Sequence, residues 1–179
     1  MTRFMKSLTR RFWSDEDGAT NVVEFALWSP IFIGVILSGI ELAAITVRHT
    51  ALERALDETV RDIRLGKENV QTSTDVKQLI CDRAGILPSC VENLELEMVQ
   101  LSPRDWQSPP DQAQCVDTTG EIKPAVSFSY GKDNELMFLR ACYRFKPIAP
   151  TSSMGESVRK DTEGYSAIIS TSAFVQEPG

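Results

Sequence analysis

Residues 17–47 read DGATNVVEFALWSPIFIGVILSGIELAAITV and form the longest apolar run of this 179-residue chain. As a helix that rises about 1.5 Å per residue, the part from Val22 to Val47 would reach roughly 39 Å. That length exceeds the ~30 Å hydrocarbon core of a bilayer. The run therefore predicts one transmembrane helix over about residues 22–47.

Two carboxylates interrupt this apolar run. An ionised side chain in the middle of a bilayer costs about 2.5–3.5 kcal/mol on insertion scales, so each carboxylate needs an explanation. Glu41 lies seven residues before Arg48, and we expect it to reach interfacial water or to pair with a neighbour. Glu24 lies at the other end, six residues after Gly18, where geometry alone allows either an interfacial position or a specific role.

The charges before the run predict how the helix is oriented. The leader is basic first and acidic afterwards, with Arg3, Lys6, Arg10 and Arg11 followed by Asp15, Glu16 and Asp17. A basic flank before a membrane helix favours a cytoplasmic N-terminus, which places the remainder of the chain beyond the membrane. An ordinary cleaved secretory signal is disfavoured, because its apolar region is only about 7–15 residues long.

A pattern of specific residues surrounds Glu24. The segment Glu16-Asp17-Gly18-Ala19-Thr20-Asn21-Val22-Val23-Glu24-Phe25-Ala26-Leu27-Trp28-Ser29-Pro30 joins a charged leader, a glycine, a carboxylate and a proline. This arrangement resembles the type IV prepilin class, most closely the TadE-like pseudopilins of tight-adherence (Tad/Flp) pili. The resemblance covers roughly residues 10–60, and its Glu-Phe-Ala-Leu-x-x-Pro part includes Glu24, Phe25 and Pro30.

One position departs from the family pattern. The family glutamate is usually the fifth residue after the glycine, whereas Glu24 is the sixth residue after Gly18. Cleavage after Ala19 would restore the fifth place and make Thr20 the new N-terminus. Cleavage after Gly18 and the absence of any processing are the alternatives.

The resemblance implies a non-enzymatic, membrane-anchored pseudopilin or minor pilin that acts in assembly or initiation of a Tad-type (type IVc) adhesion pilus. It implies that Glu24 is an assembly carboxylate that pairs with the N-terminal amine of a neighbouring subunit and sets the axial register. The implied partners are a sister minor pilin, the major pilin, a prepilin peptidase and, indirectly, the platform protein and the assembly ATPase. The implied location is the bacterial inner membrane with a periplasmic C-terminal domain, and entry into the extracellular pilus stays open.

Two other functions remain alternatives at this point. The helix would serve as a permanent anchor if the periplasmic domain is a binding or interaction module. A minor pseudopilin of a type II-like secretion system would share the same anchor. The mature N-terminus separates processing from simple anchoring, since processing would leave a start at Ala19 or Thr20.

Beyond the apolar run, the sequence predicts an α+β fold. Apolar residues continue at three- and four-residue steps from Leu52 to Ile63, which extends the long helix as an amphipathic one with Gly66 as its cap. A short second helix is expected over about 75–84. Period-two alternation predicts a small antiparallel sheet of three or four strands, at about 94–99, 125–130, 135–145 and 164–176. The expected division is a leader (1–18), a TadE-like region (19–66) and a disulfide-braced domain (67–179).

Four cysteines lie in this last region, at positions 81, 90, 115 and 142. They form no Cys-x-x-Cys pair, which argues against a zinc knuckle or a thioredoxin-type motif. An even number beyond the membrane indicates two disulfides, for which three pairings are possible. We favour Cys81–Cys90, between the second helix and the following turn, and Cys115–Cys142, between a long loop and the central strand.

The sequence argues against several other classes of function. It has no glycine-rich phosphate loop, no nucleophile motif and one histidine, His49, which we expect to be an interfacial polar residue. Neither a catalytic residue, a cofactor, a metal site nor a small-molecule substrate is predicted. The formal net charge of −6 argues against nucleic acid as a partner.

Overall fold

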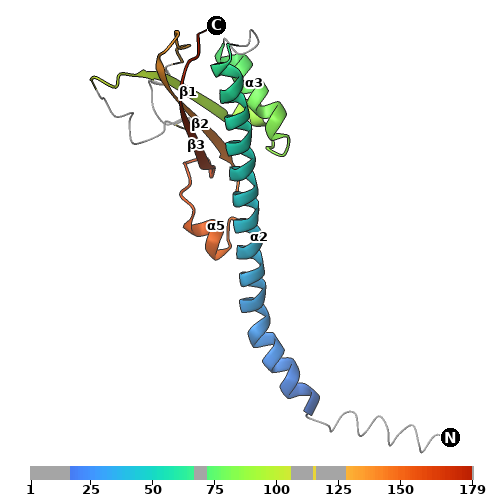
Figure 1. Ribbon diagram of the computed structural model, residues 1–179. Coiled ribbons are helices and arrows are strands. Elements are labelled where there is room, and N and C mark those ends of the chain that lie inside the picture. The colour runs from blue at the N-terminus through green and yellow to red at the C-terminus, as the bar shows by residue number, and fades with distance from the viewer. Residues whose placement is uncertain (1–16, 67–71, 106–114, 116–127, 179) are drawn as a thin grey trace, which may run out of the picture.

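The computed structural model describes residues 17–66, 72–105, 115 and 128–178, and side chains are described from residue 21 onward. A long helix extends away from a domain that contains shorter helices and an antiparallel sheet (Figure 1). This arrangement confirms the α+β fold. Residues 1–16, which make up most of the predicted leader, lie outside the described residues.

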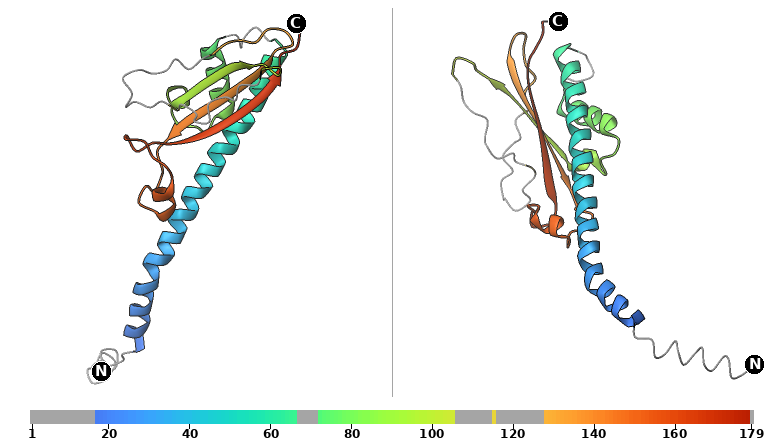
Figure 2. Two further views of the ribbon diagram at one scale, coloured as in Figure 1. Left: turned by 90° about the vertical axis from the view of Figure 1, so that its left-hand side faces the viewer. Right: turned by 60° about the horizontal axis from the view of Figure 1, so that its bottom comes forward.

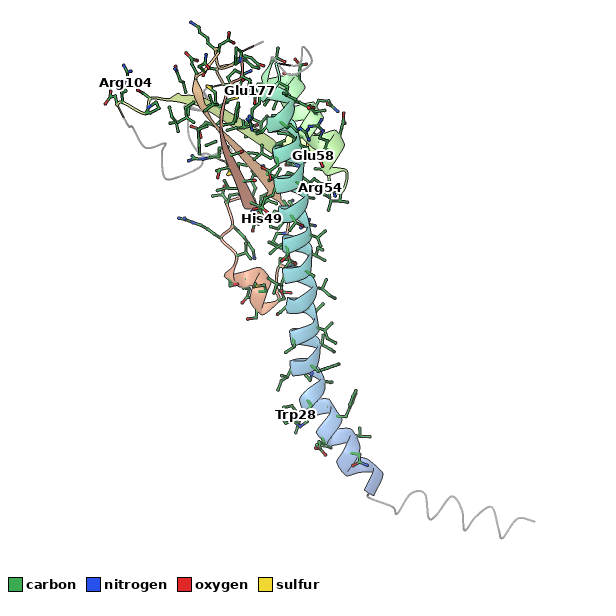
Figure 3. All side chains as sticks on the ribbon, in the orientation of Figure 1. Trp28, His49, Arg54, Glu58, Arg104 and Glu177 are labelled. Atoms are coloured by element: carbon green, nitrogen blue, oxygen red, sulfur yellow. A yellow bond between two sulfur atoms is a disulfide. The ribbon has the colours of Figure 1, made fainter. Side chains whose placement is uncertain are left out.

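The long helix α2 runs over Asp17–Arg64 and therefore begins five residues earlier than predicted. Gly66 follows its last turn, as predicted for the cap. The φ of Gly66 is +63°, a left-handed conformation that glycine adopts without strain. Pro30 lies inside the helix and has no N–H to donate to the carbonyl of Ala26. The helix axis bends near Trp28, within one turn of this missing hydrogen bond (Figure 3).

The second helix, α3 (Ser73–Ala84), begins slightly before its predicted start. The Thr72 hydroxyl caps it by accepting a hydrogen bond from the Asp75 N–H at 3.2 Å. Two further helices, α4 (Cys90–Asn93) and α5 (Ser153–Ser157), lie where the sequence predicted a turn and a loop. Helices of four and five residues are too short to produce a readable periodicity, which explains why the pattern missed them.

The described sheet contains β1 (Leu94–Leu101), β2 (Leu136–Phe145) and β3 (Ser166–Val175), all antiparallel and in the order β1-β2-β3. β2 is the central strand, as its two apolar faces predicted. The expected strand at 125–130 is reduced to a single bridge between Phe128 and Met98, and residues 125–127 lie outside the described residues.

The core lies between one face of this sheet and the C-terminal half of α2, with α3 packed against α2 (Figure 2). Alternate residues of β1 and β2 face this core, and α2 contributes residues at helical spacing. The fully or almost fully buried side chains include Leu52, Leu56, Ile63, Leu96, Met98, Met137, Leu139 and Tyr143. Burial of each such side chain contributes about 1.5–3 kcal/mol.

The two faces of β3 differ in burial. Ala167, Ile169 and Thr171 share one face, which is exposed. The core receives Ile168 and Phe174 from the opposite face, with serines between them. These small serine side chains leave room for α2 to approach β3 closely.

Candidate membrane anchor and assembly site

The N-terminal half of α2 presents apolar side chains that nothing in the described domain covers. Phe25 is 73% exposed and Val35 is 67% exposed, and side chains project from this part of the helix without a neighbour (Figure 3). Burial against the rest of the domain begins at Glu41, and before it the small residues Gly34 and Ser38 lie beside the loop that contains α5. Residues 21–40 therefore form a bare apolar rod.

The dimensions of this rod match those of a bilayer. A helix covering residues 21–40 is about 30 Å long, which equals the hydrocarbon thickness. By length and composition, α2 is the one helix of the described part of the chain that could cross a membrane, over Asn21–Arg64. Lipid would remove these exposed apolar side chains from water as effectively as a protein core would.

Glu24 projects from this rod and is exposed. Within the described ranges, its carboxylate has neither a hydrogen-bond nor an ion-pair partner, although Phe25 and other apolar residues surround it. The backbone of Gly18, Ala19 and Thr20 forms the first helical turn of α2. In lipid, an unpaired Glu24 would need a cation from outside this chain.

Glu41 has a different environment from the one expected. It is fully buried, and its Oε2 accepts a hydrogen bond of 2.7 Å from the backbone N–H of Ala149. Its other oxygen, Oε1, is buried without a partner among the described residues. The loop after β2 therefore returns to α2 and removes this carboxylate from interfacial water.

The same loop places α5 beside α2 (Figure 1). The Ser152 hydroxyl caps the start of α5 by accepting a hydrogen bond of 3.0 Å from the Gly155 N–H. A Cβ at position 155 would clash with the Ala149 carbonyl oxygen, so only glycine fits there. An open, mostly apolar groove of about 700 Å³ separates this segment from α2 and is lined by Gly34 and Ser38. These two small residues of α2 thus lie beside the protein's own loop.

Two contacts hold the end of β2, one from the turn after α3 and one from α2. The Tyr143 hydroxyl donates a hydrogen bond of 2.7 Å to the Pro88 carbonyl, and the Arg48 guanidinium lies 5.0 Å above the Phe145 ring. Burial raises the pKa of Tyr143 above its ordinary value, and the positive charge of Arg48 partly opposes this shift. These contacts fix the sheet against α2 just above the bare rod.

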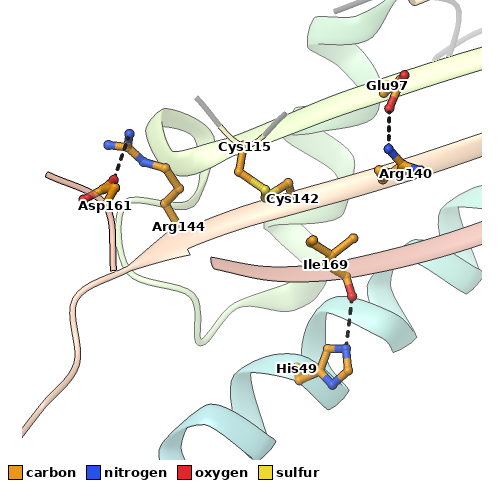
Figure 4. Close-up of a disulfide and its surroundings, with 8 residues drawn as sticks. All are labelled: His49, Glu97, Cys115, Arg140, Cys142, Arg144, Asp161 and Ile169. Carbon is orange, nitrogen blue, oxygen red and sulfur yellow. Dashed lines mark hydrogen bonds and ion pairs between the residues drawn. A yellow bond between two sulfur atoms is a disulfide. The ribbon is translucent and has the colours of Figure 1, made fainter. Parts of the chain in front are cut away.

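His49 is held by the edge of the sheet. Its Nε2 lies 3.2 Å from the Ile169 carbonyl oxygen (Figure 4). The same nitrogen lies 3.5 Å from the Glu53 carboxylate. His49 therefore connects α2 to β3. Its side chain is also partly exposed. Nothing in the sequence pattern indicated this contact, because the two residues are 120 positions apart.

Two disulfides brace the domain. Cys81 is joined to Cys90 and Cys115 to Cys142, each with a Cα–Cα distance of 5.6 Å. These are the two pairings that the sequence favoured. The second bridge lies on the sheet face that points away from α2 (Figure 4), beside the ion pair of Arg140 with Glu97 at 3.2 Å.

The described residues offer no other obvious chemistry. Across residues 17–66, 72–105, 115 and 128–178, no group of three or more histidine, cysteine, aspartate or glutamate side chains could hold a metal ion. The ion pairs in this part of the chain lie within α2, as for Arg54 with Glu58, or join different segments of the domain, as for Arg83 with Asp62. The features that remain to be explained are the bare rod and its unpaired carboxylate.

Comparison with known proteins also points to the long helix α2. A family model described as TadE-like protein matches residues 21–61, which comprise the bare rod and most of the packed half of α2. The match confirms the resemblance to the TadE-like family. No curated protein and no solved structure is detectably similar to the chain. The match indicates a Tad-pilus-associated protein with a candidate membrane-anchoring helix, in a family that is not known to be enzymatic.

Proposed function

We propose that this protein is a pseudopilin or minor pilin that acts without catalysis in the assembly or initiation of a Tad-type adhesion pilus. The observation that supports the proposal most strongly is the coincidence of the TadE-like match with a bare apolar rod of bilayer length. In this proposal the N-terminus is cytoplasmic and the disulfide-braced domain is periplasmic. The partners are a sister minor pilin and the major pilin, with the platform protein and ATPase acting from the cytoplasmic side.

Glu24 acts in this proposal as the assembly carboxylate. Helices that bundle in lipid or in a fibre exclude water, so an unpaired carboxylate there is costly. The N-terminal amine of a neighbouring subunit would supply the missing cation. Because the pair forms at one relative height only, it would also fix the axial register between subunits.

Replacement of Glu24 by glutamine tests this role. The Glu24→Gln protein should insert into the membrane normally, because the substitution removes a charge from an apolar helix. Piliation should fall severalfold, since the neighbouring amine loses its counter-ion. Pili are counted by electron microscopy in Glu24→Gln, wild-type and Glu53→Gln cells. The Glu53→Gln control alters an exposed carboxylate on the same helix. Wild-type pilus numbers in Glu24→Gln cells would refute the assigned role.

The mature N-terminus tests the processing step separately. Mass spectrometry of the membrane-extracted protein should find a start at Ala19 or Thr20 if a prepilin peptidase removes the leader. A chain that begins at Met1 or Thr2 would limit the proposal to an unprocessed assembly factor.

A further inference from the structure

The groove between α2 and the start of α5 has an apolar floor and a polar end. Its floor consists of residues from the 29–38 stretch of α2, and its other wall consists of residues 151–153. Its volume of about 700 Å³ falls within the roughly 300–1,000 Å³ that is typical of small-molecule sites. Along α2, α5 lies between Trp28 and His49 and closer to His49 (Figures 1 and 3), so residues 151–153 mark the end of the groove nearer the domain.

The floor of the groove has the length of one membrane leaflet. Ten helical residues extend over about 15 Å, which is half of the ~30 Å hydrocarbon core. When the bare rod fills this core, residues 29–38 lie mostly in the leaflet on the side of the domain. The open side of the groove then faces hydrocarbon, and its polar end lies at the level of the lipid headgroups.

A positive charge and two free hydroxyls lie at this polar end. The Lys160 Nζ donates a hydrogen bond of 3.1 Å to the Pro150 carbonyl, and Pro150 directly precedes Thr151. Lys160 has no carboxylate partner among the described residues, so two of its three N–H donors remain for a ligand. The side chains of Thr151 and Ser153 line the groove, and neither hydroxyl is bonded to another residue of the described ranges.

The acids close to Lys160 in the sequence are engaged elsewhere or lie outside the groove. Asp161 and Glu163 lie 3.6 and 3.5 Å from the Arg144 guanidinium. Glu156 of α5 does not line the groove. The polar end therefore offers a cation and hydroxyl donors but no carboxylate, in a chain whose formal net charge is −6.

We propose that this groove binds one anionic phospholipid from the leaflet on the side of the domain. One acyl chain would lie along the apolar floor, and the phosphate would meet Lys160, Thr151 and Ser153. The inference rests on the membrane topology of the proposed function, and it adds a lipid partner at a site separate from Glu24.

The two ends of the groove match the two parts of such a lipid. Ammonium and hydroxyl donors bind phosphate oxygens, and basic sites beside membrane helices bind anionic headgroups. A headgroup with its own ammonium would repel Lys160, so phosphatidylglycerol should bind more tightly than phosphatidylethanolamine. A lipid also ends at its headgroup, whereas a neighbouring membrane helix would have to pass α5 to continue towards the domain.

Two substitutions test the two ends of the site. Gly34→Leu fills the floor, and the helix accepts it because a Cβ at this position meets no atom within 4 Å. Gly39→Leu is the matched control, since Gly39 has the same free space and does not line the groove. Lys160→Gln removes the charge but keeps an N–H donor for the Pro150 carbonyl. Its control is Lys132→Gln, which alters an exposed lysine before β2, at the opposite end of that strand.

Native mass spectrometry of the full chain, released from detergent micelles, provides the readout. The wild type and the four variants are titrated with phosphatidylglycerol or with phosphatidylethanolamine of the same acyl chains. Equal thermal midpoints of the five proteins show that all of them fold.

We expect the wild type to bind one phosphatidylglycerol about fivefold more tightly than phosphatidylethanolamine, as one lysine at a membrane surface would provide. Lys160→Gln should remove this preference by weakening the binding of phosphatidylglycerol. Gly34→Leu should weaken the binding of both lipids about tenfold, because the acyl chain loses its apolar floor. Both control variants should bind as the wild type does.

The inference would be overturned if the wild type bound both lipids equally, or if Lys160→Gln or Gly34→Leu left the binding of phosphatidylglycerol unchanged. A second protein that is bound to the purified chain in place of lipid, and is released by Gly34→Leu but not by Gly39→Leu, would also overturn it. Failure of the proposed function has a different signature. Wild-type pilus numbers in Glu24→Gln cells would reject the assembly role and leave the lipid affinities in detergent as measured.

Discussion

At the residue scale, the two glutamates of α2 show how position decides the role of a carboxylate. Both interrupt the same apolar run, but only Glu24 lies within the motif that resembles the TadE-like family. The structure buries Glu41 against the Ala149 N–H and leaves Glu24 exposed among apolar side chains. Glu41 is therefore satisfied in part within its own chain, whereas Glu24 has no partner among the described residues and pairs with another subunit only in the proposed function. The difference arises from a contact 108 residues away in sequence, which no local pattern reveals.

Removal of the Glu41 carboxylate should release the loop that contains α5. A hydrogen bond to a charged group contributes about 1.5–3 kcal/mol, so Glu41→Ala should increase amide exchange at Ala149 about tenfold or more. Glu41→Gln retains a carbonyl acceptor and should show a much smaller increase. Hydrogen exchange followed by mass spectrometry on the detergent-solubilised chain measures both, and equal exchange in all three proteins would contradict the assigned contact.

Tyr143 should make the stability of the domain depend on alkaline pH. Burial raises its pKa above 10.0 in the folded state, so the folded chain holds the phenolic proton more tightly than the unfolded chain. This contribution is fully present below pH 10 and is lost as the pH rises through the raised pKa. Tyr143→Phe should be less stable by about 1–2 kcal/mol at neutral pH, because the Pro88 carbonyl loses its donor.

Denaturant unfolding at pH 8 and pH 11, followed by circular dichroism, tests this expectation. The gap between Tyr143→Phe and the wild type should narrow at the higher pH. A gap that stays constant would show that ionisation of Tyr143 does not affect stability.

At the element scale, the long patterns in the sequence were the reliable ones. α2, α3 and the three strands were predicted from periodicity, with bounds shifted by a few residues. The helices α4 and α5 were missed, because four or five residues contain barely one helical turn. The alternation could not predict which face of β3 is buried, because Ile168 and Ile169 are equally apolar. Only the position of α2 decides that Ile168 faces the core.

The two disulfides should differ in how much they stabilise the domain. They close loops with sequence separations of 9 and 27 residues. In the chain-entropy model these loops correspond to about 2.5 and 3.5 kcal/mol. Replacing Cys115 and Cys142 together by serine should therefore lower the free energy of unfolding by about 1 kcal/mol more than the same change at Cys81 and Cys90. Denaturant titration of the two double variants would show this order, and the reverse order would count against the entropic explanation.

At the scale of the whole molecule, the sequence predicted a rod and a domain but not how they join. The apolar run and its flanking charges indicated the anchor, and the cysteines indicated the bracing of the domain. The contacts that fix the rod to the domain, from Glu41 to Ala149 and from His49 to Ile169, join distant parts of the chain. The packing of α2 against β3 is a further contact of this kind, although the sequence did predict β2 as the central strand.

The orientation of the whole chain can be tested with a reporter fused after Gly179. An alkaline phosphatase fusion should be active, because the domain is expected beyond the inner membrane, and a fluorescent protein that folds only in the cytoplasm should stay dark. Both fusions should fractionate with the membrane and require detergent for release. A dark phosphatase fusion or a freely soluble chain would reject the topology.

The position of α5 on α2 has a mechanical consequence. Its exposed polar residues, Thr151, Ser153 and Glu156, lie beside the upper end of the bare rod and are poorly suited to hydrocarbon. In the proposed membrane topology these polar side chains would resist entry into hydrocarbon, so a segment more than 100 residues away in the chain would limit how deeply the helix that contains Glu24 inserts. Extraction of the protein towards the side of the domain would then move these polar residues away from the lipid rather than through it.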